Sequence, residues 1–236
     1  LSSAASDVYK RQEGYSEVNH KELAGTQKNA WLKVLTSQFP DKPKEEIRIL
    51  DIGTGPGFFP VILAEAGYHV DAVDYTEGML EKAKENAGDL CRNIRFLRMD
   101  AQKLDFEDNT FDVVISRNLT WNLEHPDVAY REWVRVLKVG GRLLNFDANW
   151  YGYLYDEEKR LSYEEDRKSV ESEHLDDHYL CTDIDRMEKI ALQMPLSSIN
   201  RPSWDRKFLK ENGFESVAVD TGIWQRVWSC LLYTSD

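Results

Sequence analysis

A short apolar run followed at once by three glycines is the feature that most constrains how this chain folds. Residues 49–59 read Ile-Leu-Asp-Ile-Gly-Thr-Gly-Pro-Gly-Phe-Phe. Residues 48–52 have the composition of a buried parallel strand, and residues 58–66 have the composition of a helix. Glycine permits positive φ and lets the backbone approach a ligand without an intervening Cβ. Together these features predict the nucleotide-binding edge of a doubly wound, mostly parallel α/β sheet flanked by helices.

The glycines are spaced G-x-G-x-G, which differs from the G-x-G-x-x-G fingerprint of dinucleotide-binding turns. The last glycine of that fingerprint would fall at position 58, which is Phe58. A bound pyrophosphate needs backbone N–H groups at the helix N-terminus, and Pro56 removes one such donor. The turn therefore predicts a ligand that contains adenosine but no diphosphate.

The composition of the whole chain narrows the class of protein. Its 236 residues suffice for one α/β domain with a real core, and the net charge of −12 argues against a broad basic surface for nucleic acid. The three cysteines have neither metal-ligand spacing nor the even count of a disulfide framework. No apolar run of about 18 residues and no signal peptide is recognisable. We therefore expect a cytoplasmic protein without nucleic-acid or membrane partners, and the oligomeric state is not indicated.

Both ends of the chain resemble translated sequencing-adaptor sequence. Residues 7–12, Asp-Val-Tyr-Lys-Arg-Gln, can be back-translated into a transposon mosaic end, and residues 230–235 into its reverse complement. We expect residues 1–12 and 230–236 to be non-native tails, which are set aside in fold reasoning. Ordinary frayed termini are the alternative. A single domain would then span residues 13–229.

An acid follows the second predicted strand, residues 68–74. Asp74 lies 23 residues beyond Asp51, close to the interval at which an acid accepts hydrogen bonds from ribose hydroxyls. An ionised carboxylate suits this role because it only accepts. A solvated strand end is the alternative for Asp74. Thr76 is expected to cap the next helix, residues 77–86.

The rest of the chain alternates between apolar strands and helices. Further strands are predicted at residues 94–99, 111–116, 142–147 and 214–220. Further helices are predicted at residues 17–39, 127–137, 156–173, 185–193 and 203–212. Glycines in residues 138–141 predict a turn between the helix and the strand on either side. After residue 220 we expect the final antiparallel strand of such a sheet to be missing or incomplete.

Two strings resemble the class I S-adenosylmethionine-dependent methyltransferases. The glycine turn resembles motif I of that family, and residues 136–147, VLKVGGRLLNFD, resemble the helix–glycine–strand segment of its small-molecule members. Val139 stands where a proline is usual. The resemblance covers about residues 47–148 and is nearest to the broad group that includes quinone C-methyltransferases. It implies S-adenosylmethionine as cofactor, S-adenosylhomocysteine as product and a small molecule as methyl acceptor.

The resemblance also implies roles for individual residues. Asp100 would bind the adenine amino group and the Ala101 backbone the adenine ring, with a helix N-cap as the competing role of Asp100. The full set implied to line the cofactor is Asp51, Gly53, Gly55, Asp74, Tyr75, Asp100, Ala101 and Arg117. Asn118, Trp121 and Tyr15 are candidates for the acceptor side. Trp121 could equally belong to the core, and surface packing is the favoured alternative for Tyr15. Residues 117–122 lack the Asn-Pro-Pro-Tyr or Asp-Pro-Pro-Tyr signature, which argues against DNA bases and glutamine as acceptors.

Residues 151–200, the lid segment, are acidic and aromatic, and the resemblance implies a lid over the acceptor. His174 and His178 lie four residues apart, which permits a metal site, but solvated acidic surface is commoner and no metal is predicted. Methyl transfer from a sulfonium needs positioning and exclusion of water more than a nucleophilic side chain. No catalytic residue is therefore assigned. An acceptor that must lose a proton would need a base, and the candidates are His20, His125, His174 and His178.

Two other functions stay open at this stage. A nicotinamide-dependent oxidoreductase shares the fold, but Phe58 at the third glycine position counts against it. A non-catalytic S-adenosylmethionine-binding protein, whose lid binds a partner, is the second alternative.

Overall fold

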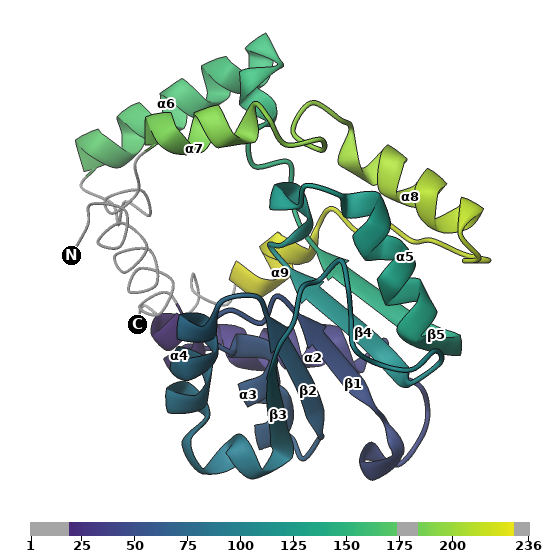
Figure 1. The fold of residues 1–236 in the computed structure, drawn as a ribbon. Coiled ribbons are helices and arrows are strands. Elements are labelled where there is room, and N and C mark those ends of the chain that lie inside the picture. The colour runs from purple at the N-terminus through teal and green to yellow at the C-terminus, as the bar shows by residue number, and fades with distance from the viewer. Residues whose placement is uncertain (1–18, 174–183, 229–236) are drawn as a thin grey trace.

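A computed structural model describes residues 19–173 and 184–228 of the chain. Its centre is a five-stranded sheet in the order β3-β2-β1-β4-β5, in which every neighbouring pair is parallel (Figure 1). The strands are β1 (Ile49–Ile52), β2 (Val70–Asp74), β3 (Ile94–Arg98), β4 (Phe111–Arg117) and β5 (Leu137–Phe146). The chain runs outward from β1 to β3 and then crosses to β4, so the strand order reverses beside β1. Ligands of such sheets bind at the carboxyl ends of the strands at this reversal. The predicted fold class is confirmed.

Helices cover both faces of the sheet. Clusters of buried apolar residues join one face to α2 (Gln27–Thr36), α3 (Phe58–Glu65), α4 (Glu77–Ala87) and α9 (Ile223–Trp228). The other face packs against α5 (Pro126–Val136) and α8 (Arg201–Glu211). All of β1 and all but the last residue of β4 are buried, as expected for central strands covered on both sides.

The lid segment leaves the sheet where β5 ends. It contains η4 (Gly152–Leu154), α6 (Glu157–Glu173) and α7 (Ile184–Ala191), and Figure 1 shows α6 and α7 on the carboxyl-terminal side of the sheet. Both helices match the predicted ranges. The structure also contains three short 3-10 helices elsewhere in the described residues, η1 (Lys44–Glu46), η2 (Gly88–Asn93) and η3 (Thr120–Asn122). Within residues 19–173 and 184–228, no helix is both long and apolar enough to cross a membrane.

Two predicted features of the sheet were wrong. Residues 214–220 do not pair with the sheet, and the apolar pattern arises because Phe214 and Val217 pack against the core beside α8. Residues 138–141 are not a separate turn but lie inside β5. There Leu137 pairs with Phe111 and Arg142 pairs with Val113, so the glycines bulge out of the ladder between two paired positions.

Two predicted helix features also differ. The helix predicted at residues 17–39 is interrupted at Gly25, giving helical residues 19–24 and then α2. A Cβ at Gly25 would lie 3.1 Å from the Lys21 carbonyl oxygen, so glycine allows this close approach. Thr76 precedes α4, but its side chain makes no capping hydrogen bond.

The amino-terminal edge of the sheet is fastened by one acid. Asp112, which is 3% exposed, accepts bonds from Lys42 Nζ (2.7 Å), Lys138 Nζ (2.8 Å) and the Arg48 N–H (3.0 Å). Burial alone would raise the pKa of Asp112, but these bonds outweigh it and lower the pKa to about 2. The charged side chains at this edge are paired with one another and stabilise the fold. We therefore look for the functional site at the opposite, carboxyl-terminal edge.

Candidate functional site

The glycine turn (residues 53–57) adopts a conformation that only glycine tolerates well. Gly53, Gly55 and Gly57 have φ angles of 70°, 53° and 88°, all in the left-handed region. The N–H groups of Gly53 and Thr54 both donate to the Val73 carbonyl, at 2.9 and 3.0 Å. The turn is thereby fixed to the end of β2, next to Asp74.

Asp74 joins the glycine turn to the start of α4. One of its carboxylate oxygens accepts the Gly55 N–H at 2.9 Å and the other accepts the Thr76 N–H at 2.9 Å. Burial raises the pKa of Asp74, although hydrogen bonds from Thr76, Gly55 and Tyr75 oppose the shift. A carboxylate only accepts hydrogen bonds and has about four accepting positions, which these protein donors share with any bound ligand.

Asp51 at the end of β1 is the most strongly perturbed acid of this edge. It is 3% exposed, and burial raises its pKa to about 7, with the charge of Asp74 adding to the shift and that of Arg117 opposing it. A cation placed beside Asp51 would favour the ionised form. The pair of acids therefore makes this edge suited to a ligand that carries positive charge.

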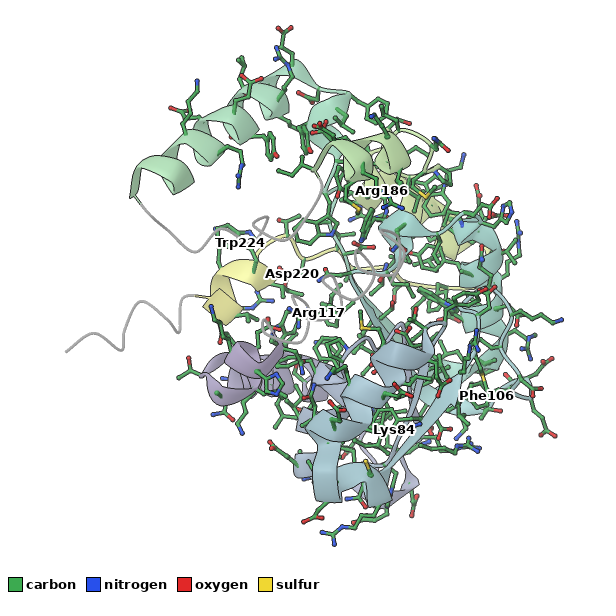
Figure 2. All side chains as sticks on the ribbon, turned by 60° about the vertical axis from the view of Figure 1, so that its left-hand side comes forward. Lys84, Phe106, Arg117, Arg186, Asp220 and Trp224 are labelled. Atoms are coloured by element: carbon green, nitrogen blue, oxygen red, sulfur yellow. The ribbon has the colours of Figure 1, made fainter. Side chains whose placement is uncertain are left out.

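Arg117 at the end of β4 makes an ion pair with Glu22 that no sequence pattern predicts. Its guanidinium donates to both carboxylate oxygens of Glu22, at 3.0 and 2.6 Å, and lies 4.9 Å from the centre of the Trp31 ring. Figure 2 shows Arg117 toward the centre of the molecule. The arginine thus fastens helical residues 19–24 to the sheet, and its contact with a cofactor stays a prediction.

The residues after β3 form a turn at the same edge. Asp100 accepts the Gln102 N–H at 2.8 Å, and the Ala101 carbonyl accepts the indole N–H of Trp133 at 2.9 Å. No helix begins at Asp100, so its competing N-cap role is wrong. Tyr75 is 68% exposed beside this turn. The proposed adenine contacts of these residues stay predictions.

The β4 loop (residues 118–122) carries the acceptor-side candidates. Asn118 is exposed and has a φ of 55°, and its carbonyl accepts the Trp121 indole N–H at 3.0 Å. The Trp121 ring is half-buried, 5.3 Å from the ring of Tyr151 at the start of the lid segment. A Cβ on Gly53 would lie 2.8 Å from Leu119, so the loop also touches the glycine turn. The structure therefore brings Trp121 to the lid and Leu119 to the glycine turn.

Some candidates fall on parts of the chain that the structure does not describe. Tyr15, His174 and His178 lie outside the described residues, whereas His20 and His125 are described and exposed. Across residues 19–173 and 184–228, no group of three or more His, Cys, Asp or Glu side chains gathers as a metal site.

Sequence reasoning missed several polar residues that shape this edge. Asn19 and Asn86 both donate their side-chain amides to the Pro56 carbonyl, at 3.3 and 2.8 Å. Asp147 accepts the Trp121 N–H at 3.0 Å. Each contact joins residues at least 26 positions apart, and no periodic pattern in a single sequence encodes such a pairing.

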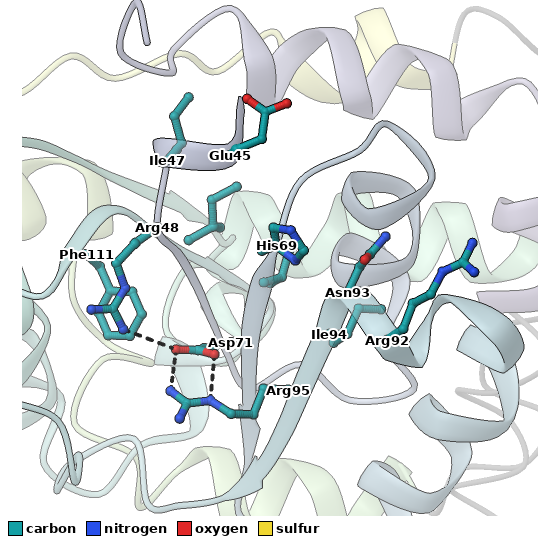
Figure 3. Close-up of a pocket in the computed structure, with 12 residues that line it drawn as sticks. Glu45, Ile47, Arg48, His69, Asp71, Arg92, Asn93, Ile94, Arg95 and Phe111 are labelled. Carbon is teal, nitrogen blue, oxygen red and sulfur yellow. Dashed lines mark hydrogen bonds and ion pairs between the residues drawn. The ribbon is translucent and has the colours of Figure 1, made fainter. Parts of the chain in front are cut away.

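A pocket of about 340 Å³ lies at the opposite, amino-terminal edge, between the starts of β1, β2 and β3. Figure 3 shows Arg48 and Arg95 both directed at Asp71 there, and Arg95 donates to it at 2.8 and 2.7 Å. Size alone would favour this pocket as a ligand site. We favour the carboxyl edge, because the two arginines are already paired and the glycine turn lies at the other end of the strands.

Comparisons with known proteins show what the sheet region of this chain is similar to. Residues 50–145 match the family profile described as a methyltransferase domain, a span that includes β1 to β5 except the first residue of β1 and the last residue of β5. A solved Methanococcus maripaludis structure, classed with S-adenosylmethionine-dependent methyltransferases, has a TM-score of 0.56 and 22% identity and covers 89% of this chain and 87% of its own. That likeness shows the fold.

Two curated relatives each match about half of this chain or less than half. A demethylmenaquinone methyltransferase of Clavibacter sepedonicus is 41% identical over 98 residues, covering 41% of this chain and 39% of that protein. A ubiquinone/menaquinone biosynthesis C-methyltransferase of Xanthomonas campestris is 34% identical over 138 residues, covering 54% and 53%. The chain thus spans about half, or less, of the length of these relatives. Residues 50–145 therefore match a methyltransferase domain, and the part of the chain shared with these relatives resembles the quinone C-methyltransferases.

Proposed function

We propose that this chain transfers a methyl group from S-adenosylmethionine to a small molecule that carries a quinol-type ring. The observation that carries the proposal is the bond between Asp74 and the Gly55 N–H, which places a carboxylate directly beside a glycine turn. The match of residues 50–145 to a methyltransferase domain supports assigning this carboxylate and the glycine turn to an S-adenosylmethionine site.

The residues present fit an adenosine-containing cation. Among the described residues, a Cβ built on Gly55 meets no atom within 4 Å, so this part of the structure leaves the backbone there open to a ligand. Asp74 is a carboxylate at the end of β2 that can accept hydrogen bonds from ribose hydroxyls, and Asp51 supplies negative charge nearby. We assign ribose to Asp74 and the adenine ring to Asp100 and Ala101. These assignments are proposals for the cofactor S-adenosylmethionine.

The chain's own contribution to the reaction is electrostatic and positional. When bound, the cofactor supplies an electrophilic methyl group on a sulfonium, and leaves as neutral-sulfur S-adenosylhomocysteine once a nucleophile has taken the methyl and given up a proton. Asp51 and Asp74 favour a cation at this edge. The β4 loop and the lid segment hold the acceptor and exclude water. No catalytic base is assigned.

A flat ring is the acceptor that the lid side suits best. Trp121, Tyr151 and Tyr153 form a chain of neighbouring rings, with centroids 5.3 and 6.0 Å apart, where the β4 loop meets the lid segment. Aromatic side chains bind flat apolar rings by stacking and by edge contacts. The named substrates of the relatives, demethylmenaquinone and ubiquinone or menaquinone precursors, are of this class.

The nicotinamide alternative is not favoured. Pro56 has no N–H, and the Gly57 N–H already donates to the Thr54 carbonyl at 3.0 Å, so two donors that a diphosphate would use are missing. A Tyr-x-x-x-Lys spacing occurs at Tyr155 and Lys159, but it lies in the lid segment. There the Tyr155 hydroxyl donates to the Leu192 carbonyl at 3.3 Å and Lys159 lies beside Asp156.

Two measurements test the proposed function. Titration calorimetry should detect S-adenosylhomocysteine binding and no NADH binding. Binding of NADH without binding of S-adenosylhomocysteine would show that the cofactor is a nicotinamide. The chain is then incubated with methyl-labelled S-adenosylmethionine and a short-chain demethylmenaquinol. Label in the quinol ring supports the proposal. Cofactor binding without label in the quinol or in any component of a metabolite extract would favour a non-catalytic binding protein.

Binding of the cofactor should also release protons. The pKa of Asp51 is about 7 in the absence of ligand, so the side chain is partly protonated at about pH 6.5, and a nearby cation lowers that pKa. Affinity for S-adenosylmethionine should therefore rise with pH through about 5 to 7 and then level off. Calorimetry in buffers of different ionisation enthalpy measures the protons released. Asp51→Asn should abolish the release, and a wild-type release of zero protons would contradict the assignment.

A further inference from the structure

A buried polar cluster lies where the lid segment returns to the sheet. Its central residue is Arg201, the first residue of α8, whose side chain is 6% exposed. The Asp147 side chain directly after β5 is 2% exposed. The remaining members are Thr120, Asp205, Tyr130 and Asn145. None of these residues belongs to the proposed cofactor site.

Arg201 binds three other members of the cluster. It donates to Thr120 Oγ1 at 2.6 Å, to Asp147 Oδ2 at 3.3 Å and to Asp205 Oδ2 at 3.2 Å. The Thr120 hydroxyl donates in turn to Asp147, so its one proton is used and its lone pairs receive Arg201 and Asn145. The single guanidinium therefore faces two carboxylates, those of Asp147 and Asp205.

The contacts of Arg201 converge on the β4 loop. The Asp147 oxygen that pairs with Arg201 also accepts the Trp121 N–H at 3.0 Å. Arg201 therefore binds residue 120 directly and residue 121 through one carboxylate. These two positions set the direction of the Trp121 ring, which lies 5.3 Å from Tyr151.

The same cluster closes the base of the lid segment. Asn149 donates its side-chain amide to the Ile199 carbonyl at 3.2 Å, which brings the two ends of residues 151–200 together. Arg201 follows two residues later and reaches across to the β4 loop. One side chain thus connects the returning end of the lid segment to the loop that carries the acceptor-side candidates.

We propose that Arg201 is a positioning residue that sets the β4 loop relative to the base of the lid segment and so orients the acceptor. The inference rests on the proposed function, because the β4 loop is assigned to the acceptor there. Without the guanidinium, Asp147 is a buried carboxylate without its cation, so the loop that depends on it must rearrange. A displacement of about 1 Å in a reacting geometry lowers rates on the order of 100-fold.

The kinetic test compares two variants of α8 in the full chain. Arg201→Met should lower kcat toward the short-chain demethylmenaquinol by about 10- to 100-fold while the S-adenosylhomocysteine Kd changes less than about twofold. Arg206→Met, on an exposed position of the same helix, should change neither value. Arg201→Lys should restore part of the lost kcat, because it returns the charge without the fork of donors. Equal kcat in wild type and a folded Arg201→Met variant would overturn the proposal.

A second variant covers the case in which Arg201→Met does not fold. Thr120→Val removes the hydroxyl that Arg201 binds and leaves the ion pairs of Arg201 with Asp147 and Asp205 in place. It should lower kcat in the same direction with cofactor affinity preserved. A Thr120→Val variant that loses cofactor affinity and kcat together would indicate a general structural role and overturn the proposal.

A spectroscopic measurement separates this proposal from the proposed function. The chain is labelled with 5-fluorotryptophan, and the Trp121 resonance is assigned by its loss in Trp121→Phe. In Arg201→Met and Thr120→Val the Trp121 line should shift while the line of Trp31, which lies outside the cluster, stays in place. If demethylmenaquinol is not methylated, the acceptor assignment fails, but the position of the Trp121 line still tests the positioning role of Arg201. A Trp121 line that does not move overturns the positioning role.

Discussion

Replacing Asp74 with alanine is expected to weaken S-adenosylhomocysteine binding by about 30- to 1,000-fold, or roughly 2–4 kcal/mol. Two hydrogen bonds from ribose hydroxyls to a charged acceptor would be lost. The Gly55 N–H, which donates to Asp74 at 2.9 Å, would also lose the partner that holds the glycine turn. Asp74→Asn should lose less affinity than Asp74→Ala, because an amide oxygen can still accept one hydroxyl.

Titration calorimetry measures this effect, and the same strand provides a matched control. Asp71 also lies on β2, but it binds Arg95 at the opposite edge of the sheet. Asp71→Ala should therefore leave S-adenosylhomocysteine affinity unchanged. An Asp74→Ala affinity equal to that of wild type would remove Asp74 from the ribose site.

Replacing Gly55 with alanine is expected to separate ligand binding from folding. The added methyl meets no atom of residues 19–173 and 184–228 within 4 Å, so the cost to folding is about 1–2 kcal/mol from the φ of +53° alone. The methyl would instead occupy space assigned to the cofactor. We expect S-adenosylhomocysteine affinity to fall by about 100-fold or more, which corresponds to roughly 3 kcal/mol.

Two other glycines make this experiment specific. Gly67 has a φ of +89° and equally open surroundings, so Gly67→Ala should show a comparable folding cost and normal affinity. Gly57 has a φ of +88°, and its Cβ would lie 3.0 Å from that of Ala83, so Gly57→Ala should damage the fold itself. Urea unfolding and calorimetry on the three variants measure both quantities. Equal affinities for the Gly55 and Gly67 variants would show that the ligand lies elsewhere.

The sheet and its functional edge could be predicted from the sequence because both depend on local patterns. Buried parallel strands are continuous apolar runs, and each of the first four runs was placed within two residues of its observed bounds. Positive φ at Gly53 and Gly55 follows from a glycine turn of this kind. An acid at the end of β2 is then adjacent to the turn by topology alone.

The wrong secondary-structure predictions came from residue patterns that serve tertiary packing. Residues 214–220 alternate in the manner of a strand, yet Phe214 and Val217 bury their side chains against the core without forming a ladder. In residues 138–141 the glycines suggested a turn, but neighbouring residues on both sides pair with β4, so the chain bulges and continues. Local propensity cannot tell these cases apart, because the deciding contacts are remote.

The polar partnerships of the site could not be predicted at all. Arg117 and Glu22 are 95 positions apart, and Arg201 and Thr120 are 81 apart. A single arginine or glutamate in a sequence reads as exposed surface, since these residues are usually exposed. Only the folded chain shows that Glu22 is 5% exposed and bound to a cation between aromatic rings.

The bond between Asn149 and Ile199 has a consequence for how such a chain can diversify. It joins the two points at which the lid segment departs from and returns to the framework, so the intervening residues form a closed loop on a fixed base. The entropy of closing a loop grows only logarithmically with its length, about 0.6 kcal/mol for each doubling. Insertions, deletions or wholesale exchange between residues 149 and 199 therefore cost the framework little. Acceptor preference can therefore change through substitutions and length changes in the lid segment, while the strands and the glycine turn stay the same.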